Sequence, residues 1–502
     1  MPQPSNLPSG YKQWWARLSD HLGGIYPFYN LESGYHCSLD IGDVVDRRRE
    51  SGLAVDLDTV GVAGKACLPF LLGDRTLLRN VRRAPWMAQP TRDGNWAPVD
   101  LPPHGRARPD PDAFVGRLRE ALVDEAAFYV EGLDTVGILL SGGMDSRVAA
   151  GILRELQQRS GSPSQVVALT WGEEASRDVV YSGWIADRFG WERCHFPLGG
   201  ENLATNIEIA GLMGAEVSPL HLHAMREVAR IEGVDAIIAG SYGDSVGRAE
   251  FSGRRLPKLK SILPRAVDQF GILRTTVRDD VMPALMEDAG SDPHLRDVSN
   301  TIRRHEIEQE LHYMRRMLQA SMFVIAKRIP LCQMFTASSV FSLMWALDPA
   351  VRDDSWYHRL LSQLPGDLLS IPWARTGRRY GDGSGNCDNY QKMYHSYGRW
   401  LRGELRQVVV ERVKGDRIRG LGIFSDRGLD NALRVWSKAN TRSTNALDEL
   451  MSWLASLDVF LARYDLQGSI ADSPETLKDR LRALKGRAHA ETYIAVRERF
   501  RE

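Results

Sequence analysis

A short glycine-rich segment, SGGMDS at residues 141–146, holds residue types that bind phosphate. Gly142 and Gly143 carry no side chain, so the backbone there can approach an anion closely. The hydroxyls of Ser141 and Ser146 can donate hydrogen bonds to phosphate oxygens. The segment therefore predicts a cradle for a phosphate group.

Asp145 adds a cation to this prediction. A carboxylate beside phosphate oxygens is favourable only where a cation bridges them, so Asp145 indicates Mg²⁺. The helix expected from about this residue directs its N-terminal N–H groups at the same place. No Gly-Lys-Ser/Thr follows at the spacing of a Walker A motif, so the segment is a different kind of phosphate loop.

A second segment, GSYGDS at residues 240–245, repeats this arrangement after another apolar run. It places two small residues, Gly240 and Ser241, before the carboxylate of Asp244. The carboxyl ends of parallel strands meet along one edge of a sheet, so Asp145 and Asp244 are expected to converge on one Mg²⁺ ion. Together the two segments predict a site for pyrophosphate.

Thr170 and Trp171 end an apolar run that lies between the two segments in the sequence. Their backbone groups can read the edge of an adenine, and the indole can cover its face. A Trp buried in a loop is the alternative, and the sequence leaves both open. Leu140 ends the run before the first segment, and Asp178 is expected to start a helix.

Apolar runs alternate with amphipathic stretches through the middle of the chain. Fully apolar strands are predicted at 135–141, 165–170 and 235–240, and helices at 146–159 and 176–190. This alternation is typical of a parallel sheet covered on both faces. From about residue 265 onward, long periodic stretches such as 301–328 predict a mostly helical second half.

The region before the sheet has a different composition. Seven prolines between residues 85 and 112 predict a linker, and short alternating pieces before it predict a β-rich region. We therefore expect a first domain at 1–87, a linker at 88–112, a sheet-bearing domain at 113–475 and a helical tail at 476–502, the tail being a solvated helix.

The overall composition is that of an ordinary globular protein. The 64 basic and 64 acidic side chains cancel, which argues against a nucleic-acid or membrane partner. The five cysteines show no C-x-x-C spacing, which favours reduced thiols and a cytoplasmic location. No apolar run approaches 18 residues, and the N-terminus lacks the apolar core of a signal peptide.

With these features the chain resembles the asparagine synthetase family of pyrophosphate-loop ATP enzymes. SGGMDSR matches the first loop of that family, GSYGDS falls where members carry a second loop with a Mg²⁺-binding Asp, and residues 68–86 resemble the end of its glutaminase domain. The resemblance implies an α/β synthetase domain with a parallel sheet and a large helical part. It also implies a β-rich, degenerate Ntn-glutaminase-like (α+β) domain before it.

The resemblance further implies ATP and Mg²⁺ as cofactors and an AMP-forming reaction. In the family, ATP adenylates a carboxylate, and an amine then displaces AMP to form an amide. Asp145 and Asp244 would ligate Mg²⁺ and act in catalysis. The residues that would hold ATP are Leu140, Ser141, Gly142, Gly143, Asp145, Ser146, Thr170, Trp171, Gly240 and Ser241.

Two departures from the family concern its nitrogen source and its substrate. Pro2 stands where glutaminase members have a catalytic cysteine, so this chain is not expected to hydrolyse glutamine. In this it resembles β-lactam synthetase and lasso-peptide macrolactam synthetase. The second loop offers Ser241, Tyr242 and Ser245 where many synthetases have acidic residues, which argues against aspartate as the substrate.

A third departure concerns a lysine that the family uses to stabilise transition-state charge. Residues 352–365, which we align with that region, contain no Lys. Arg352 or Arg359 are candidate replacements, and the role is otherwise assigned to Arg375 and Arg378. Arg379 belongs to the same basic stretch. A solvated basic loop is the alternative, and the glycines that follow suggest a lid.

The resulting hypothesis is an ATP-dependent carbon–nitrogen ligase acting on a small molecule or peptide that supplies a carboxylate and an amine. Cyclising a peptide or a specialised metabolite, as in natural-product biosynthesis, is one setting. A non-catalytic ATP-binding partner protein and an enzyme that adenylates another acceptor, such as tRNA, stay open, as do a homo-oligomer and a pathway partner. His221 and His223 are not expected to bind metal, because residues two apart on a helix do not share a face.

Overall fold

The computed structural model describes residues 21–32, 37–91, 95–247, 262–263, 267–381, 383–384, 389–441, 443–468, 470 and 474–500. At its centre is a five-stranded sheet in the order β10-β9-β6-β7-β8, in which every neighbouring pair is parallel. Its strands are β6 (Thr135–Leu139), β7 (Gln165–Gly172), β8 (Glu192–Pro197), β9 (Ala236–Ala239) and β10 (Leu331–Gln333). The three predicted strands and the parallel sheet are confirmed, and β8 and β10 extend it on either side.

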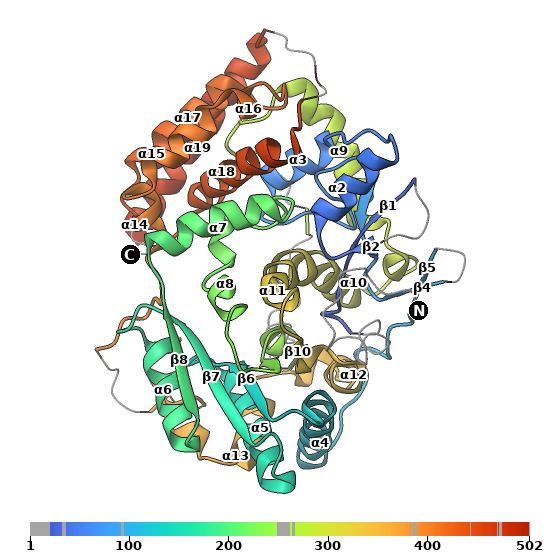
Figure 1. The fold of residues 1–502 in the computed structure, drawn as a ribbon, viewed down its shortest axis with the longest axis vertical. Helices are drawn as coiled ribbons and strands as arrows, with labels where there is room; N and C mark the ends of the chain where they lie inside the picture. The colour runs from blue at the N-terminus through green and yellow to red at the C-terminus, as the bar shows by residue number, and fades with distance from the viewer. Residues whose placement is uncertain are drawn as a thin grey trace.

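Helices cover both faces of this sheet, as the apolar strands require (Figure 1). They are α4 (Pro111–Val130), α5 (Met144–Ser160), α6 (Arg177–Phe189), α12 (Ser338–Ala346) and α13 (Ser355–Gln363). Local signals fix their ends: Asp110 caps α4 by accepting from the Ala113 N–H at 3.0 Å. Gly161 ends α5 and Gly190 ends α6, both in the left-handed conformation.

A second helical layer lies at the end of the molecule opposite the sheet (Figure 1). It contains α7 (Gly200–Leu212), α9 (Thr275–Gly290), α14 (Tyr397–Arg402), α15 (Arg406–Lys414), α16 (Asp416–Arg419), α17 (Asp426–Lys438), α18 (Ala446–Tyr464) and α19 (Leu477–Phe500). Helix α18 is almost wholly buried and forms the centre of this layer.

Between sheet and helical layer runs one continuous helical stretch. It begins as α10 (Thr301–Glu308), continues as a π-helical segment at Gln309–Gln319 and ends as α11 (Ala320–Ala326). The prediction of a helix over 301–328 is thus confirmed. The short helix α8 (Met225–Val228) packs against α11.

The N-terminal part does not form a core of its own in the described residues. It contributes β1 (Phe28–Asn30), β2 (Cys37–Ser38), β3 (Val81–Arg83), α2 (Ile41–Glu50) and α3 (Thr59–Cys67). The strands form a small antiparallel sheet, and in the described part of this region the two helices contain more residues than the strands do, so the β-rich prediction is not confirmed. Trp86 packs in one core with the parallel sheet, and Phe28 packs in another with α18. A glutaminase-like character is not confirmed.

The predicted linker and tail are both more structured than expected. Within 88–112, strands β4 (Ala88–Pro90) and β5 (Trp96–Pro98) pair antiparallel. The tail is helical as predicted, but it is not a free solvated helix: α19 packs against α17, and Ala483, Ala490 and Ile494 are buried. Small residues on one face of α19 allow that close packing, which its mixed charge conceals in the sequence.

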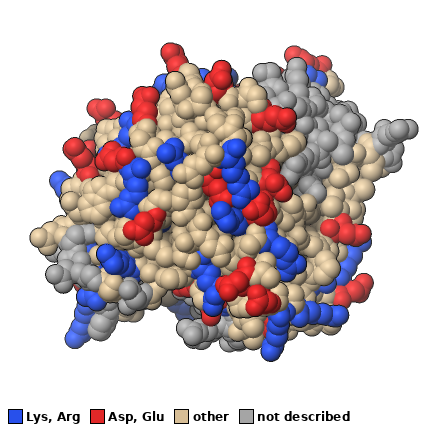
Figure 2. All heavy atoms as spheres, turned by 90° about the horizontal axis from the view of Figure 1, so that it is seen from below, with Lys and Arg blue, Asp and Glu red and all other residues tan. Residues whose placement is uncertain are grey.

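Positive and negative side chains are interspersed on the face that Figure 2 shows, in keeping with the balanced composition. Among the helices of the described residues, none is both long and apolar enough to cross a bilayer.

Candidate active site

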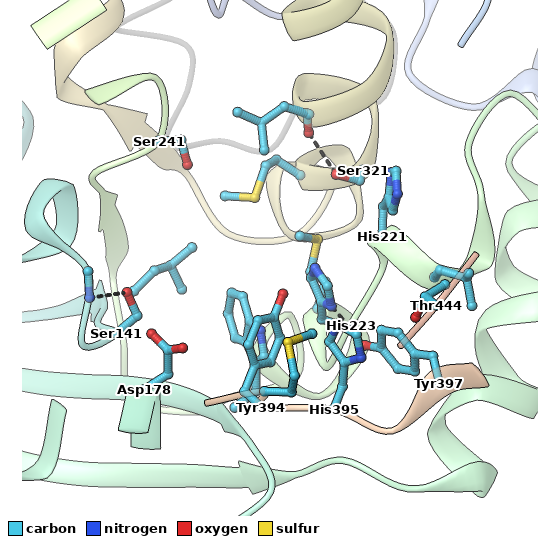
Figure 3. A pocket seen from close by; sticks show the side chains of 18 of the residues that line it. Ser141, Asp178, His221, His223, Ser241, Ser321, Tyr394, His395, Tyr397 and Thr444 are labelled. Carbon is cyan, nitrogen blue, oxygen red and sulfur yellow. Dashed lines mark hydrogen bonds between the residues drawn. The ribbon is translucent and has the colours of Figure 1, made fainter. Parts of the chain in front are cut away.

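A cavity of about 710 Å³ opens between the carboxyl edge of the sheet and the helical layer. One side is formed by the two glycine loops and Asp178, and the other by side chains from the helical layer (Figure 3). Its lining includes Leu139, Leu140, Ser141, Gly143, Asp145, Ser146, Trp171, Asp178, Leu220, His221, His223, Met225, Gly240, Ser241, Met317, Leu318, Ser321, Met322, Met393, Tyr394, His395, Tyr397, Ser443, Thr444, Glu449 and Arg497.

Hydrogen bonds among its own residues fix the conformation of the first loop. The Ser141 and Ser146 hydroxyl oxygens lie 3.0 Å apart, and the Gly143 N–H donates to the Ser141 hydroxyl at 3.1 Å. Gly143 is the N-cap residue of α5, and no side chain caps the helix there. The N-terminus of a 17-residue helix therefore faces the cavity beside two hydroxyls, which is an arrangement suited to an anion.

Gly142 is enclosed on the side away from the cavity. A Cβ at this position would lie 2.8 Å from the Ala374 Cβ and 3.1 Å from the Arg177 carbonyl oxygen. The Ala374 N–H donates to the Gly142 carbonyl at 3.1 Å. The Asp178 carboxylate accepts the Gly142 N–H, and burial nevertheless raises the pKa of Asp178 to about 6. Asp178 lies in the first turn of α6, near the helix start predicted for it, and also holds the first loop through Gly142.

Arg147 lies below this loop and is completely buried. Its guanidinium donates to the carbonyls of Gly142, Leu368, Ile371 and Pro372 at 2.7–3.2 Å. Burial lowers its pKa to about 9, so it stays charged at neutral pH. Arg147 therefore fastens residues 368–372 to the first loop.

The second loop packs directly on Asp145. A Cβ on Gly240 would lie 2.6 Å from the Asp145 carbonyl carbon, and one on Gly243 would lie 2.6 Å from the Asp145 Cβ. The two loops thus converge as predicted, and Gly240 and Ser241 line the cavity. Asp244 is half-buried and does not line it. Tyr242 is buried in the core.

The residues at this end of the cavity could hold Mg²⁺ through one carboxylate, that of Asp145. Mg²⁺ is commonly held by one or two carboxylates together with substrate phosphates and water. Asp145 lies at the cavity wall beside the serine hydroxyls and meets this requirement. The role of Asp244 as a second ligand stays a prediction. The described residues contain no group of three or more His, Cys, Asp or Glu suited to a metal ion.

Thr170 and Trp171 have different surroundings. The Thr170 hydroxyl is buried and donates to the Leu140 carbonyl at 2.7 Å, so its side chain joins β7 to the first loop. Trp171 lines the cavity and stacks on His223, with ring centroids 5.8 Å apart and planes at 15°. The indole therefore forms a flat wall next to the phosphate end.

The arginines that were candidates for catalysis lie outside the cavity. Arg352 is buried and hydrogen-bonded to Glu306, and Arg359 pairs with Asp112 at the surface. Arg375, Arg378 and Arg379 are exposed, although Ala374 just before them touches the phosphate loop. Their catalytic role stays a prediction. Half of the glycine-rich stretch expected to form a lid, residues 381–386, lies outside the described residues, so the lid stays a prediction.

The opposite end of the cavity contains a polar aromatic cluster that sequence reasoning did not find. His221 Nε2 lies 3.0 Å from Glu449 Oε1, and His223 Nδ1 lies 2.7 Å from the Tyr397 hydroxyl. The rings of Tyr397 and His395 stack with centroids 4.1 Å apart. Burial lowers the pKa of His223 to about 3 and that of His395 to about 4, so both rings are neutral at pH 7.

His221 and His223 do not lie on a helix of the kind assumed for them in the sequence. Pro219–His221 is a single 3₁₀ turn, and His223 adopts a positive φ of 46°, so both side chains reach the cavity. The alternation in SPLHLH (residues 218–223) was the available signal. Glu449 and Tyr397 had none, because they are more than 170 residues away in the sequence.

Comparison with known proteins bears on the sheet-bearing part of the chain. Residues 117–325 match the family model of asparagine synthase. A search of curated proteins finds no match. Among solved structures, the chain is similar to a U34-tRNA thiolase from Methanococcus maripaludis with its 4Fe-4S cluster, at 13% identity over 72% of this chain and 91% of that one, with a TM-score of 0.27. It is also similar to NMN synthetase from Francisella tularensis, at 15% identity over 39% and 78%, with a TM-score of 0.20.

At these TM-scores neither solved structure guides the interpretation of this chain. The family match is more informative, because it begins within α4 and ends within α11 and so contains both glycine loops and Trp171. It does not extend to the specific resemblance to lactam-forming synthetases. Residues 117–325 thus support a relation to the asparagine synthetases, a family of ATP-dependent carbon–nitrogen ligases.

Proposed function

We propose that this protein is an AMP-forming amide ligase, which adenylates a carboxylate with ATP and transfers the acyl group to an amine. The observation that carries the proposal is the direct packing of the second glycine loop on Asp145, at the carboxyl edge of a parallel sheet and at one end of a 710 Å³ cavity. The cavity continues well beyond this end, which leaves room for an acyl acceptor.

In this proposal the chain's own groups act on the phosphates. The Ser141 and Ser146 hydroxyls and the N-terminus of α5 hold the pyrophosphate portion of ATP, with Gly142 and Gly143 allowing close approach. Asp145, with Asp244 as the second predicted ligand, holds Mg²⁺, which neutralises the leaving pyrophosphate when bound. Trp171 covers the adenine.

We assign Arg375 and Arg378 to neutralising the charge of the same leaving pyrophosphate. They follow Ala374, whose N–H donates to the Gly142 carbonyl, so they are exposed cations that begin one residue from a contact with the first loop. We assign the nitrogen to an amine of the substrate rather than to glutamine, as the resemblance to amide-forming members without glutaminase activity implies.

The test is pyrophosphate release from ATP with a panel of carboxylates, amines and precursor peptides. Wild type is compared with Asp145→Ala and Asp244→Ala, and Asp187→Ala serves as the control because Asp187 is an exposed carboxylate on α6. We expect AMP, pyrophosphate and an amide in equal amounts from wild type and the control. Asp145→Ala is expected to lose at least about 100-fold of the rate.

The same panel separates the other candidate functions. Background release by every variant across all substrates would favour a non-catalytic ATP-binding protein. Release that requires added tRNA and no amine would favour adenylation of a nucleic acid. Glutamate formed from added glutamine would contradict the assignment of the nitrogen source.

A further inference from the structure

The group that removes the proton from the attacking amine is not among the residues predicted above. An amine must lose a proton when it forms an amide, and a base that lines the cavity accelerates this step. Besides the phosphate-end Asp145 and Asp178, the titratable and charged groups lining the cavity are His221, His223, His395, Tyr394, Tyr397, Glu449 and Arg497.

Most of these groups are poor proton acceptors at neutral pH. Burial lowers the pKa of His223 to about 3 and of His395 to about 4, so their ring nitrogens bind protons weakly. The pKa of Glu449 is lowered to about 2, because the charge of His221 and its hydrogen bond outweigh the opposing effect of burial. Burial raises the pKa of both tyrosines, which keeps them protonated. Arg497 is a cation.

His221 differs from the others in its contacts. Its Nε2 lies 3.0 Å from Glu449 Oε1, and among the described residues nothing bonds to its other ring nitrogen, Nδ1. An ionised carboxylate that accepts a hydrogen bond from the Nε2–H fixes the tautomer in which Nδ1 carries the lone pair. The ring is partly exposed, at 24%, on the wall of the cavity that it shares with the phosphate loop.

We propose that His221, oriented by Glu449, is the general base of the acyl-transfer step, and that the amine substrate occupies the histidine-lined end of the cavity. This inference rests on the proposed function. The amine nitrogen forms a bond to the acyl carbon of the adenylate, the bond from that carbon to the AMP oxygen breaks, and the amine proton moves to His221 Nδ1. Glu449 is a positioning residue, because it acts through His221.

The groups around His221 support this protonation cycle. They come from five parts of the chain. Glu449 lies on α18, Arg497 on α19, and Lys65 on α3 near Glu449. His223 follows the 3₁₀ turn that contains His221, Tyr397 begins α14, and His395 lies just before it. His223 and His395 stay neutral beside it, so Glu449 is free to stabilise the imidazolium that forms.

The experiment separates adenylation from acyl transfer. With a carboxylate that wild type adenylates, hydroxylamine traps the adenylate as a hydroxamate without needing a base, because it is largely unprotonated at neutral pH. The alkylamine that wild type accepts reports the complete reaction. His221→Gln keeps an N–H for Glu449 but cannot accept a proton, and His489→Gln on the exposed face of α19 is the control.

We expect His221→Gln to lower amide formation at least about 100-fold while hydroxamate formation falls far less. His221→Ala is expected to regain amide formation as imidazole is added, which a merely structural role would not produce. Glu449→Gln is expected to shift the pH profile of amide formation, whereas the control His489→Gln is expected to keep the wild-type profile. If wild type forms neither product, the proposed function itself is wrong. If His221→Gln matches wild type for both products, only this inference is wrong.

Discussion

The two ends of the cavity are built in different ways. At the phosphate end, the backbone of the second loop packs on Asp145: Gly240 meets its backbone and Gly243 its side chain so closely that neither position has space for a Cβ. At the histidine end, side chains from five separate segments meet, and their contacts are ring stacks and single hydrogen bonds such as His223–Tyr397. The first end is tightly packed and leaves little room for substitution, whereas the second can change its chemistry one side chain at a time.

This difference teaches where variation in the reaction can arise. In the proposed reaction the phosphate end does the same work on ATP whichever acyl substrate is used, so tight packing there is compatible with different substrates. The histidine end would contact the acceptor, and its side chains come from the helical layer, so they are replaceable without moving the sheet. Mutations at the two ends should therefore fail in different ways.

The largest effect is expected from Arg147→Met, which removes the support beneath the phosphate end. Four carbonyls lose a charged donor inside the core, so we expect unfolding to become easier by about 3 kcal/mol or more. Urea denaturation measures this change. Arg154→Met on the same helix is the control, since Arg154 is only half-buried, and an equal loss in both variants would contradict the role of Arg147.

Gly240→Ala tests the rigidity of the phosphate end directly. Its Cβ would meet backbone atoms of Asp145 and Ser146 at 2.6–2.7 Å, so the two loops must separate, and we expect pyrophosphate release to fall about 100-fold. Gly116→Ala on α4 adds the same methyl where nothing lies within 4 Å. Retention of more than a tenth of the rate by Gly240→Ala would show that the loops tolerate displacement.

His223→Gln tests the histidine end through acid stability. The folded state lowers the pKa of His223 to about 3, so the stability it gives is present above pH 6.5 and is lost as the pH falls toward 3. Wild type should lose about 2 kcal/mol from this residue between pH 7 and pH 5, and His223→Gln should lose correspondingly less. Unfolding free energies in urea at the two pH values give the answer, with His489→Gln keeping the wild-type difference.

The smallest effect is expected at Trp171, where the two ends meet. Trp171→Ala should weaken ATP binding up to about tenfold, because a stacked aromatic contact contributes about 1 kcal/mol, and Trp171→Phe should retain most of the affinity. Titration calorimetry with ATP measures both. Unchanged affinity in Trp171→Ala would favour the alternative in which the indole only packs against His223.

The same contrast explains how far the sequence could predict the structure. Strands β6, β7 and β9 and helices α5 and α6 were predictable, because each depends on residues within one short segment. The meeting of the two loops was predictable for another reason, since the ends of parallel strands lie along one edge of a sheet. The burial of Arg147 was not, since its partners at 368–372 lie more than 200 residues away. The positions of His221 and His223 were missed for a local reason, namely that a proline-led 3₁₀ turn replaced the assumed helix.

Because Arg497 lines the cavity, the cavity is complete only once the chain has been made as far as α19. Arg497 lies on the last helix, yet it lines the same cavity as Ser141 and holds Ser443 and the Thr444 carbonyl, each at 2.8 Å. During synthesis, the residues of the phosphate loop are therefore made hundreds of residues before the cavity can close. A ribosome-bound chain that ends before residue 497 therefore holds both glycine loops but lacks the side chain that fastens Ser443 and Thr444 at the other end of the cavity.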